Sequence, residues 1–494
     1  MRRTGDRMNE RVWDVLIVGA GLSGIGAAAE IRRQFPGRSV AVLESRERLG
    51  GTWDLFRYPG VRSDSDMYTL GFKAKPWRKP GSIVDGPSIL AYLREMAEES
   101  GVAALIHYGK EATAADWSSE RAEWAVTVRD ADGSSTVWRT KFLQLCTGYY
   151  SYTEAYRPHF EGETDFRGRI VHPQFWPDDL DYRGQRVVVI GSGATAITLV
   201  PSLTDKAAHV TLLQRSPSYV ANQPGEDALA RLLGGVLPDA IVYPLVRWKH
   251  ILASSLFYKI ARKRPAMFKR WLVGLAAKEL PKDFDVKKHF SPDYNPWDQR
   301  VCAAPNGDLF REIRKGRVSV VTDGIEKFVP EGIKLRSGEV LPADLVITAT
   351  GLKVQPLGAI SVVVDGKPVK FSDTMVYRGA MLSGIPNMVH TFGYTNASWT
   401  LRADLIAAYV CRLLRHCDRG GYDYFVAERD PTVGEMPFID FNSGYVLRAL
   451  PMLPKQGDRF PWRIHQNYLR DMGVTRFSRL EDAALKFRRA GAAA

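Results

Sequence analysis

Residues 14–24 read DVLIVGAGLSG, and this stretch decides how the rest of the chain is interpreted. An apolar run typical of a buried strand is followed at once by Gly19, Gly21 and Gly24 in the spacing G-x-G-x-x-G, and then by a helical pattern. A second apolar strand ends in Glu44, 20 residues after Gly24. In such a βαβ unit the glycines permit a tight turn and close approach of a pyrophosphate, and the acid accepts the ribose hydroxyls. The stretch therefore predicts a dinucleotide-binding unit, and its acid favours FAD.

The same pattern returns 172 residues later in RVVVIGSGATA, residues 186–196. Gly191 and Gly193 occupy the first two glycine positions, and Ala196 replaces the third. The strand that follows ends in Gln214, Arg215 and Ser216, so the acid is missing. An arginine at this place suits a 2′-phosphate, although a strand-end arginine is also a common solvated residue. The second unit is therefore predicted to bind NADPH.

Two further strand ends resemble each other and bracket the second unit. One ends in Cys-Thr-Gly at 146–148 and the other in Ala-Thr-Gly at 349–351. We interpret them as the exit from the first domain and the return to it. The predicted fold is α/β with two Rossmann-like domains. The FAD-binding domain takes residues 1–150 and 346–494, and the NADPH-binding domain takes residues 151–345.

A helical insertion is predicted at about residues 226–285 of the NADPH-binding domain. Its pattern is helical and rich in aromatic residues, and Arg247 to Lys282 contains ten Lys and Arg residues against one acid, Glu279. One interpretation packs apolar stripes on the core and leaves basic faces in water. Two others remain open: peripheral contact with an anionic membrane, or a mouth for apolar substrates.

Composition excludes several other classes of protein. The chain has 494 residues, 45% hydrophobic, with a formal net charge of +13, but no nucleic-acid-binding motif accompanies the charge. The four cysteines form no C-x-x-C pair, which argues against a redox dithiol or a metal site and fits a reducing cytoplasm. No run of 18 apolar residues suggests a spanning helix. We expect a cytoplasmic protein, with membrane association left open, and the sequence does not indicate its oligomeric state.

Residues 166–177, FRGRIVHPQFWP, precede the second unit and have neither a helical period nor a strand alternation. They fit the pattern F-x-G-x-x-x-H-x-x-x-W-P through Phe166, Gly168, His172 and Trp176, which resembles the fingerprint of type I Baeyer–Villiger monooxygenases. Three further stretches resemble this family: GGTWDLFRYPGVRSD at 50–64, YNPWDQRVCAAPNGDLF at 294–310 and GYTNASWTLRADL at 393–405. The similarity covers the whole chain and is closest to the ethionamide-activating FAD-containing monooxygenase subgroup of actinobacteria.

The resemblance implies roles for individual positions. Arg300 would be the active-site arginine with Asp64 as its partner. His172, in the segment between the domains, would either couple cofactor binding between them or cap the linker by hydrogen bonds. Gln299 departs from the lysine that many ketone oxidisers carry there, and Trp399 and Asn396 are weaker candidates. The implied FAD contacts are Gly19, Gly21, Ser23, Gly24, Glu44, Thr52, Trp53, Asp54, Leu55 and Asp64. The implied NADPH contacts are Arg62, Ser63, Asp64, Gly191, Ser192, Gly193, Ala194, Thr195, Ala196, Ile197, Arg215 and Ser216.

The implied activity is that of an NADPH-dependent flavoprotein monooxygenase. Through a C4a-peroxyflavin it would insert one oxygen atom of O2 beside the carbonyl of a hydrophobic ketone to give an ester, with sulfoxidation as a further activity. One alternative is a monooxygenase that oxidises sulfides, thioamides or amines. A second alternative is a non-catalytic NADPH- or redox-sensing flavoprotein.

Overall fold

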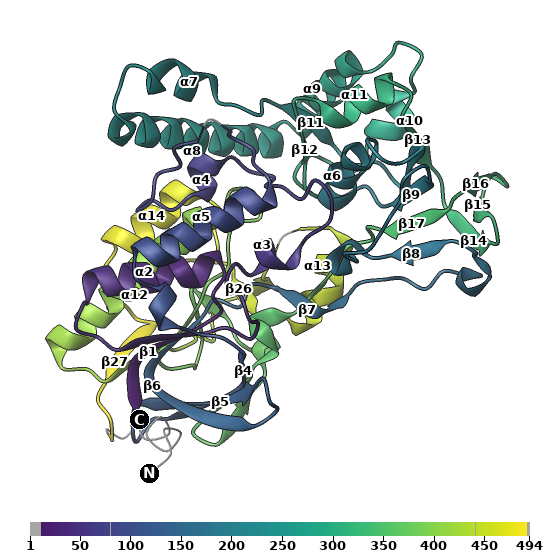
Figure 1. Cartoon of the computed structure of the whole chain (residues 1–494). Coiled ribbons are helices and arrows are strands. Elements are labelled where there is room, and N and C mark those ends of the chain that lie inside the picture. Colours follow the sequence, from purple (N-terminus) through teal and green to yellow (C-terminus); the bar gives the residue numbers. More distant parts are fainter. Residues whose placement is uncertain (1–10, 80, 440, 492–494) are drawn as a thin grey trace.

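The first sheet of the protein combines strands from both ends of the chain. A computed structural model describes residues 11–79, 81–439 and 441–491 (Figure 1). β1 (Val12–Val18) pairs in parallel with β2 (Val40–Leu43) and with β6 (Ser135–Leu145), and α2 (Leu22–Gln34) connects β1 to β2. The other strands are β3 (Ile106–His107), β4 (Lys110–Ser118), β5 (Glu123–Asp130), β19 (Ser361–Val364), β20 (Lys367–Val369) and β23 (Met388–His390). Residues Val15 to Val18 are buried because Val15 and Ile17 pack in one core cluster with α2, and Leu16 and Val18 pack in another with side chains of β4 and β5.

The second sheet lies within the middle of the chain and is parallel throughout. Its order is β13 (Val318–Thr322), β10 (His209–Gln214), β9 (Arg186–Ile190), β17 (Leu345–Thr348) and β8 (Arg169–Val171). The unit β9, α6 (Ala194–Leu203) and β10 repeats the arrangement of β1, α2 and β2. The prediction of an α/β protein with two Rossmann-like units is therefore confirmed.

Four helices follow β10 and β11 (Val220–Gln223) in the region predicted as a helical insertion. They are α7 (Ala228–Gly234), α8 (Asp239–Lys263), α9 (Pro265–Glu279) and α10 (Val286–Phe290), so the helices extend slightly beyond residue 285. α8 packs against α4 (Met67–Leu70) of the first unit, where Arg247 donates to the carbonyl oxygens of Tyr68 and Gly71, each at 2.7 Å. Arg247 also pairs with Asp404, and these contacts join the insertion to the first unit.

The remaining elements complete the two lobes around these sheets. α12 (Trp399–Gly420) packs along α2, so the C-terminal part of the chain returns to the first unit (Figure 1). Among the described residues, no helix combines the length and apolar content needed to cross a membrane. The other helices are α3 (Thr52–Leu55), α5 (Gly86–Glu99), α11 (Asp308–Arg314), α13 (Gly444–Ala449) and α14 (Tyr468–Phe477). The other strands are β7 (Tyr150–Ala155), β12 (Cys302–Pro305), β14 (Ile325–Val329), β15 (Gly332–Leu335), β16 (Val340–Pro342), β18 (Leu352–Val354), β21 (Val376–Tyr377), β22 (Met381–Leu382), β24 (Tyr424–Ala427), β25 (Glu435–Pro437), β26 (Lys455–Gly457) and β27 (Leu485–Arg488).

Candidate active site between two cofactor cavities

The first glycine turn joins β1 to α2 so closely that side chains cannot replace Gly19 and Gly24. Gly19 has φ +103°, and a Cβ there would lie 2.6 Å from the carbonyl oxygen of Cys146. A Cβ on Gly24 would lie 1.8 Å from the carbonyl oxygen of Gly19, so Gly24 serves the packing of helix on strand. A Cβ on Gly21 would lie 3.5 Å from the Cα of Gly51, which is an ordinary contact distance. This backbone leaves room for a phosphate at the N-terminus of α2.

Glu44 lies at the end of β2 in the wall of the same cavity. Its carboxylate accepts the backbone N–H of Ala20 at 2.8 Å and that of Arg46 at 3.0 Å. Burial raises the pKa of Glu44, while these backbone donors and the charge of Arg46 act in the opposite direction. The carboxylate is thus fixed beside the glycine turn, where an acid receives ribose hydroxyls.

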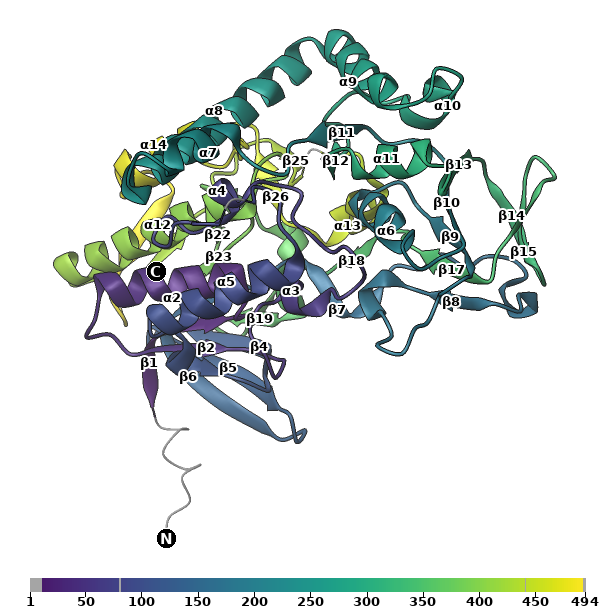
Figure 2. The same cartoon turned by 45° about the horizontal axis from the view of Figure 1, so that its top comes forward.

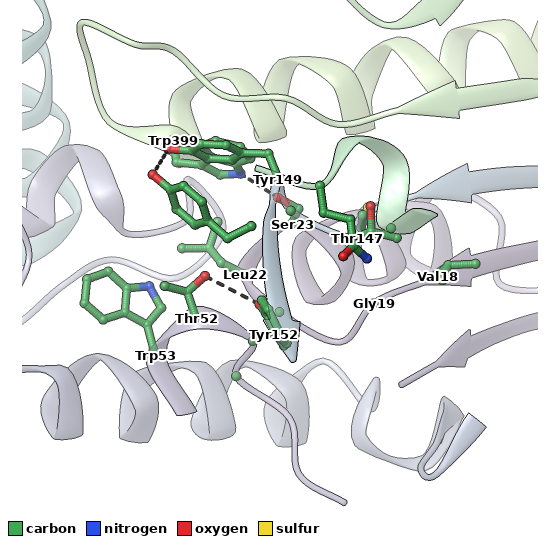
Figure 3. Close-up of a pocket in the computed structure, with 18 of the residues that line it drawn as sticks. Val18, Gly19, Leu22, Ser23, Thr52, Trp53, Thr147, Tyr149, Tyr152 and Trp399 are labelled. Carbon is green, nitrogen blue, oxygen red and sulfur yellow. Dashed lines mark hydrogen bonds between the residues drawn. The ribbon is translucent and has the colours of Figure 1, made fainter. Parts of the chain in front are cut away.

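A cavity of about 380 Å³ is lined by this turn and by Arg300. Figure 3 shows the part of its wall that contains Ser23, Tyr149 and Trp399. Trp399 donates its indole N–H to Ser23 Oγ at 2.7 Å, and its ring stacks on Tyr149 at 5.2 Å between centroids. The two side chains join the C-terminal segment to the glycine turn. The predicted residues that line this cavity are Gly19, Gly21, Ser23, Glu44, Thr52, Trp53, Ser63, Asp64, Arg300 and Trp399.

A second cavity, of about 680 Å³, extends over the other glycine turn. Gly191 has φ +138°, and a Cβ there would lie 2.3 Å from the carbonyl oxygen of Ala349. Among the residues that the structure describes, none has an atom within 4 Å of a Cβ placed on Gly193. The space beside Gly193 is therefore open to a ligand. The predicted residues in the lining are Arg62, Ser63, Asp64, Gly191, Ser192, Gly193, Ala194, Thr195, Arg215, Ser216, Gln299 and Arg300.

The two cavities meet at the ion pair of Arg300 and Asp64. Nη1 of Arg300 donates to Oδ2 of Asp64 at 2.6 Å, and both residues line both cavities. The side chains keep 34% and 45% of their surface exposed, because they border these openings. Burial disfavours the charged guanidinium, yet the charge of Asp64 leaves the pKa of Arg300 well above its ordinary value. Arg300 is therefore a permanent cation, which Asp64 holds at the junction.

Several predicted contacts lie outside the two linings, among the residues described. Asp54 is buried and pairs with Arg46 at 2.7 Å and Arg48 at 3.3 Å, so it braces the loop instead of facing the cavity. Leu55 ends the same short helix. Gly24, Ala196 and Ile197 are buried in the packing of helix on sheet. Asn396 donates to the carbonyl oxygen of Gln466 at 3.0 Å and borders a small cavity beside α8.

The fingerprint segment forms the edge of the second sheet. Phe166 is buried against Phe328, and a Cβ on Gly168 would lie 2.4 Å from the carbonyl oxygen of Asp344. His172 follows β8, and its Nδ1 accepts the N–H of Gln174 at 3.1 Å. Burial lowers the pKa of His172. The segment is more regular than its sequence suggests, since pairing with β17 organises it.

Trp176 packs edge-on against Tyr182, with 6.3 Å between ring centroids. In the part of the chain that the structure describes, His172 and Trp176 lie outside both linings. Tyr156 and Gly351, whose backbone faces the His172 ring, do line the second cavity. His172 can therefore reach a bound ligand only through its neighbours.

Sequence reasoning missed several lining residues. Tyr149 and Tyr150 share a hydrogen bond of 2.5 Å between their hydroxyl groups. Tyr149 lines the first cavity with Arg300, and Tyr150 and Tyr445 line the second with it. Their position directly after the Cys-Thr-Gly strand end was the available signal. Arg336 and Arg448 line the second cavity as additional cations, and no motif marks them.

Comparison with known proteins agrees with this arrangement. Residues 17–79 match an NAD(P)-binding Rossmann-like domain, and residues 80–351 match the flavin-binding monooxygenase-like family. The FAD-containing monooxygenase EthA of Mycobacterium tuberculosis is 52% identical over 96% of this chain and 97% of its own length. EthA of Mycolicibacterium smegmatis is 50% identical, with the same coverage.

Solved structures share the fold at low identity. A steroid monooxygenase bound to NADP matches with TM-score 0.71 and 21% identity, over 85% of this chain and 88% of its own. Cyclohexanone monooxygenase matches with TM-score 0.72 and 19% identity, over 85% and 90%. These findings confirm the predicted resemblance, the prediction of an enzyme, and FAD and NADP as its cofactors. The chain belongs to the flavin-binding monooxygenase-like family.

Proposed function

We propose that the protein is a Baeyer–Villiger monooxygenase that converts hydrophobic ketones into esters with O2 and NADPH, and that it also oxidises sulfides. The observation that carries the proposal is the Arg300–Asp64 pair at the junction of the two cavities. A reaction that joins two cofactors and a substrate needs one place where all three meet. The division into an FAD-binding domain, residues 1–150 and 346–494, and an NADPH-binding domain, residues 151–345, belongs to the same proposal.

The first cavity fits FAD by the chemistry of its wall. Gly19 and Gly21 present backbone to a pyrophosphate, Glu44 accepts ribose hydroxyls, and the Trp399–Tyr149 stack borders the far end toward Arg300. When bound, the flavin supplies the redox chemistry with O2, which amino-acid side chains do not perform. Thr52, Trp53, Ser63 and Asp64 line the same end of the cavity.

The second cavity fits NADPH by its charge. The turn at Gly191–Gly193 leads into α6, whose N-terminus favours a pyrophosphate. Arg215 and Ser216 lie at the end of β10, where an arginine pairs with a 2′-phosphate. Arg336 lies in the same lining and adds a second cation. This set favours NADPH over NADH.

Arg300 is the proposed catalytic cation. Attack of an oxygen nucleophile on a carbonyl places negative charge on the oxygen atoms of the adduct, and a fixed cation beside them lowers the barrier. A guanidinium stays protonated even where it is partly removed from water. Asp64 holds it by the hydrogen bond at 2.6 Å and prevents it from turning away.

The side chains that surround Arg300 on one side are mostly apolar, which supports a hydrophobic substrate. With Arg300 they enclose a space of only about 10 Å³, which a bound substrate would have to widen, and they are Tyr149, Val354, Phe392, Tyr394, Thr395, Trp399, Ile439, Tyr445, Val446 and Leu453. Apolar walls around one fixed cation suit a molecule with a single polar group. A ketone or a sulfide with aliphatic or aromatic substituents meets this description.

His172 is proposed to position the second cofactor and not to transfer protons. It packs against the backbone of Tyr156 and Gly351 in the wall of the second cavity. Its lowered pKa keeps the ring neutral near pH 7, so it acts by packing and hydrogen bonding. Loss of the ring would loosen the cavity wall and admit water.

Oxidation of sulfur or nitrogen in sulfides, thioamides or amines is the second candidate function. It uses the same cavities, and the two differ only in whether a carbonyl or a heteroatom is attacked. Gas chromatography of products from matched ketones and sulfides, with the NADPH consumed measured in parallel, tests the choice. Esters formed at the rate of NADPH consumption support the first function. Sulfoxides without any ester would refute it in favour of the second.

A further inference from the structure

The outer face of α8 carries a row of apolar side chains that the protein itself leaves uncovered. We define the outer stripe of α8 as Ile241, Leu245, Trp248, Leu252 and Leu256, all of them exposed. The spacings of four, three, four and four residues place them on one side of the helix. The opposite side, including Val242, Tyr243 and Val246, is buried. α8 is thus apolar on both sides, although only one side faces protein.

The outer stripe is long for an exposed surface. Fifteen residue steps separate Ile241 from Leu256, which corresponds to about 22 Å along the helix axis. Leu252 and Leu256 keep 52% and 56% of their surface exposed. Single exposed leucines are ordinary on soluble domains, but a contiguous row marks a surface that meets another apolar phase.

Basic residues continue the same line. Lys259 and Lys263 follow Leu256 after three and seven residues, and so extend the outer stripe on its own side of the helix. Within the described part of the chain, Lys259, Lys263, Arg264 and Arg270 form no ion pair, so their charges are available. Residues 239–282 contain ten Lys and Arg residues and two acids, Asp239 and Glu279.

The turn from α8 into α9 adds aromatic side chains beside these charges. Phe257 stacks on Trp271 with 6.0 Å between centroids, and both are exposed, as is Met267 on the same turn of chain. Trp248 of the outer stripe is a second exposed indole. Tryptophan and lysine next to leucine are the combination found where a protein enters the headgroup layer of a bilayer.

We propose that the outer stripe of α8, together with the α8–α9 turn, is a docking surface for an anionic lipid membrane. Both views place α7 and α8 along one outer edge of the molecule, away from the hairpin of β5 and β6 (Figures 1 and 2). A helix 25 residues long can lie in the headgroup layer with its apolar side down and its basic residues against lipid phosphates.

Charge decides between lipid and a second copy of the chain. A twofold contact through this surface would add a second set of Lys259, Lys263, Arg264 and Arg270, and residues 239–282 offer only two acids, Asp239 and Glu279, to pair with them. An anionic bilayer instead neutralises all of them while it covers the leucines.

The surface is also connected to the cofactor cavity. Ile251, on the inward side of α8, packs with Tyr394 and Leu401. Tyr394 lines the first cavity, and Ala397 borders both that cavity and the small cavity beside α8. Docking through α8 would therefore place the membrane next to the segment that encloses the catalytic cation, where an apolar substrate can be taken from lipid.

Vesicle flotation of the full-length, FAD-loaded protein tests the proposal. Vesicles of phosphatidylcholine with one third phosphatidylglycerol are compared with pure phosphatidylcholine, at low and high salt. We expect flotation with the anionic vesicles only, weakened at least tenfold by Leu252→Glu/Leu256→Glu and by Lys259→Glu/Lys263→Glu. Val137→Glu, an equally polar change at an exposed position outside α8 and α9, in β6, is the matched control and should float like the wild type.

Two results would overturn the proposal. The first is wild-type protein that stays unbound on anionic vesicles, which needs no variant to observe. The second is a dimer in sedimentation velocity that Leu252→Glu/Leu256→Glu dissociates while lipid binding is absent, since the surface is then a contact between copies. Retained FAD and unchanged NADPH oxidation in detergent-free buffer keep these outcomes separate from the enzymatic proposal.

Discussion

Replacing Arg300 by alanine should separate reduction of the enzyme from oxygen transfer to substrate. The guanidinium lies at the junction of the cavities and is held by Asp64 at 2.6 Å. Two unit charges about 4 Å apart interact with about 4 kcal/mol at an effective dielectric constant of about 20. Because Arg300 keeps 34% of its side chain exposed, we take about 2–3 kcal/mol as the loss in transition-state stabilisation. This corresponds to ester formation slower by about 30- to 150-fold.

The assay measures both half-reactions on the same preparation. Bleaching of the flavin by NADPH without oxygen should proceed at the wild-type rate in Arg300→Ala, while ester yield falls and H2O2 release rises. Arg300→Lys keeps the charge without the planar fork and should lose less. Arg183→Ala removes an exposed arginine that pairs with Asp181 at 2.8 Å and is the control for a general loss of stability.

One outcome would refute the reasoning about the cation. If Arg300→Ala forms ester at the wild-type rate, the negative charge of the reaction is stabilised elsewhere, and the pair with Asp64 is structural. Asp64→Asn gives a second check, because it leaves the cation in place without its ionic partner. Asp64→Asn should slow ester formation less than Arg300→Ala does. The double variant, Asp64→Asn with Arg300→Ala, should form ester no more slowly than Arg300→Ala alone.

Three further predictions concern the second cofactor and the stability of the fold. Arg215→Ala should reduce the preference for NADPH over NADH at least tenfold in kcat/KM, and an unchanged ratio would remove the assignment of Arg215 to the 2′-phosphate. His172→Ala should raise the fraction of NADPH that ends in H2O2 or raise the KM for NADPH, and it has no coupling function if both stay at wild-type values. His390 is fully buried with its pKa lowered to about 4 by burial and by Arg402, against 6.5 in the unfolded chain. The unfolded chain therefore binds one more proton between these values, so the free energy of unfolding should fall by about 3 kcal/mol as the pH drops from 6.5 to 4. In urea titrations, the free energy of unfolding of His390→Gln should change less between pH 6.5 and 4 than that of the wild type. An equal change in both proteins would contradict the lowered pKa of His390.

Local patterns were sufficient for the two dinucleotide units. The glycine turns at Gly19 and Gly191 and the apolar strands before them are read directly from neighbouring residues, and the structure has both units. Of the positions assigned by resemblance alone, some line the cavities and others do not. Asp54 was expected at the flavin, but its carboxylate is turned toward Arg46 and Arg48, and the sequence pattern does not contain that direction. Tyr149 and Tyr150 were missed because aromatic residues after a strand look like ordinary core.

The exposed surface of α8 is a second case in which the sequence indicates the composition and the tertiary structure shows which residues are exposed. Composition alone indicates that residues 226–285 are basic and aromatic, and it left packing, membrane contact and a substrate mouth as alternatives. Only the tertiary structure shows which side of α8 is covered, because burial of Val242 and Val246 against the first unit leaves the outer stripe to solvent.

The sequence by itself determined the class of the protein, since turns, strands and family motifs are made by residues within a few positions of one another. The tertiary structure decided where the chemistry can occur. Arg300 and Asp64 are 236 residues apart, and they meet only when the loop before β12 returns to the loop after α3. Contacts at that separation depend on how both units dock, and no local pattern encodes their distance or their common position between the two cavities.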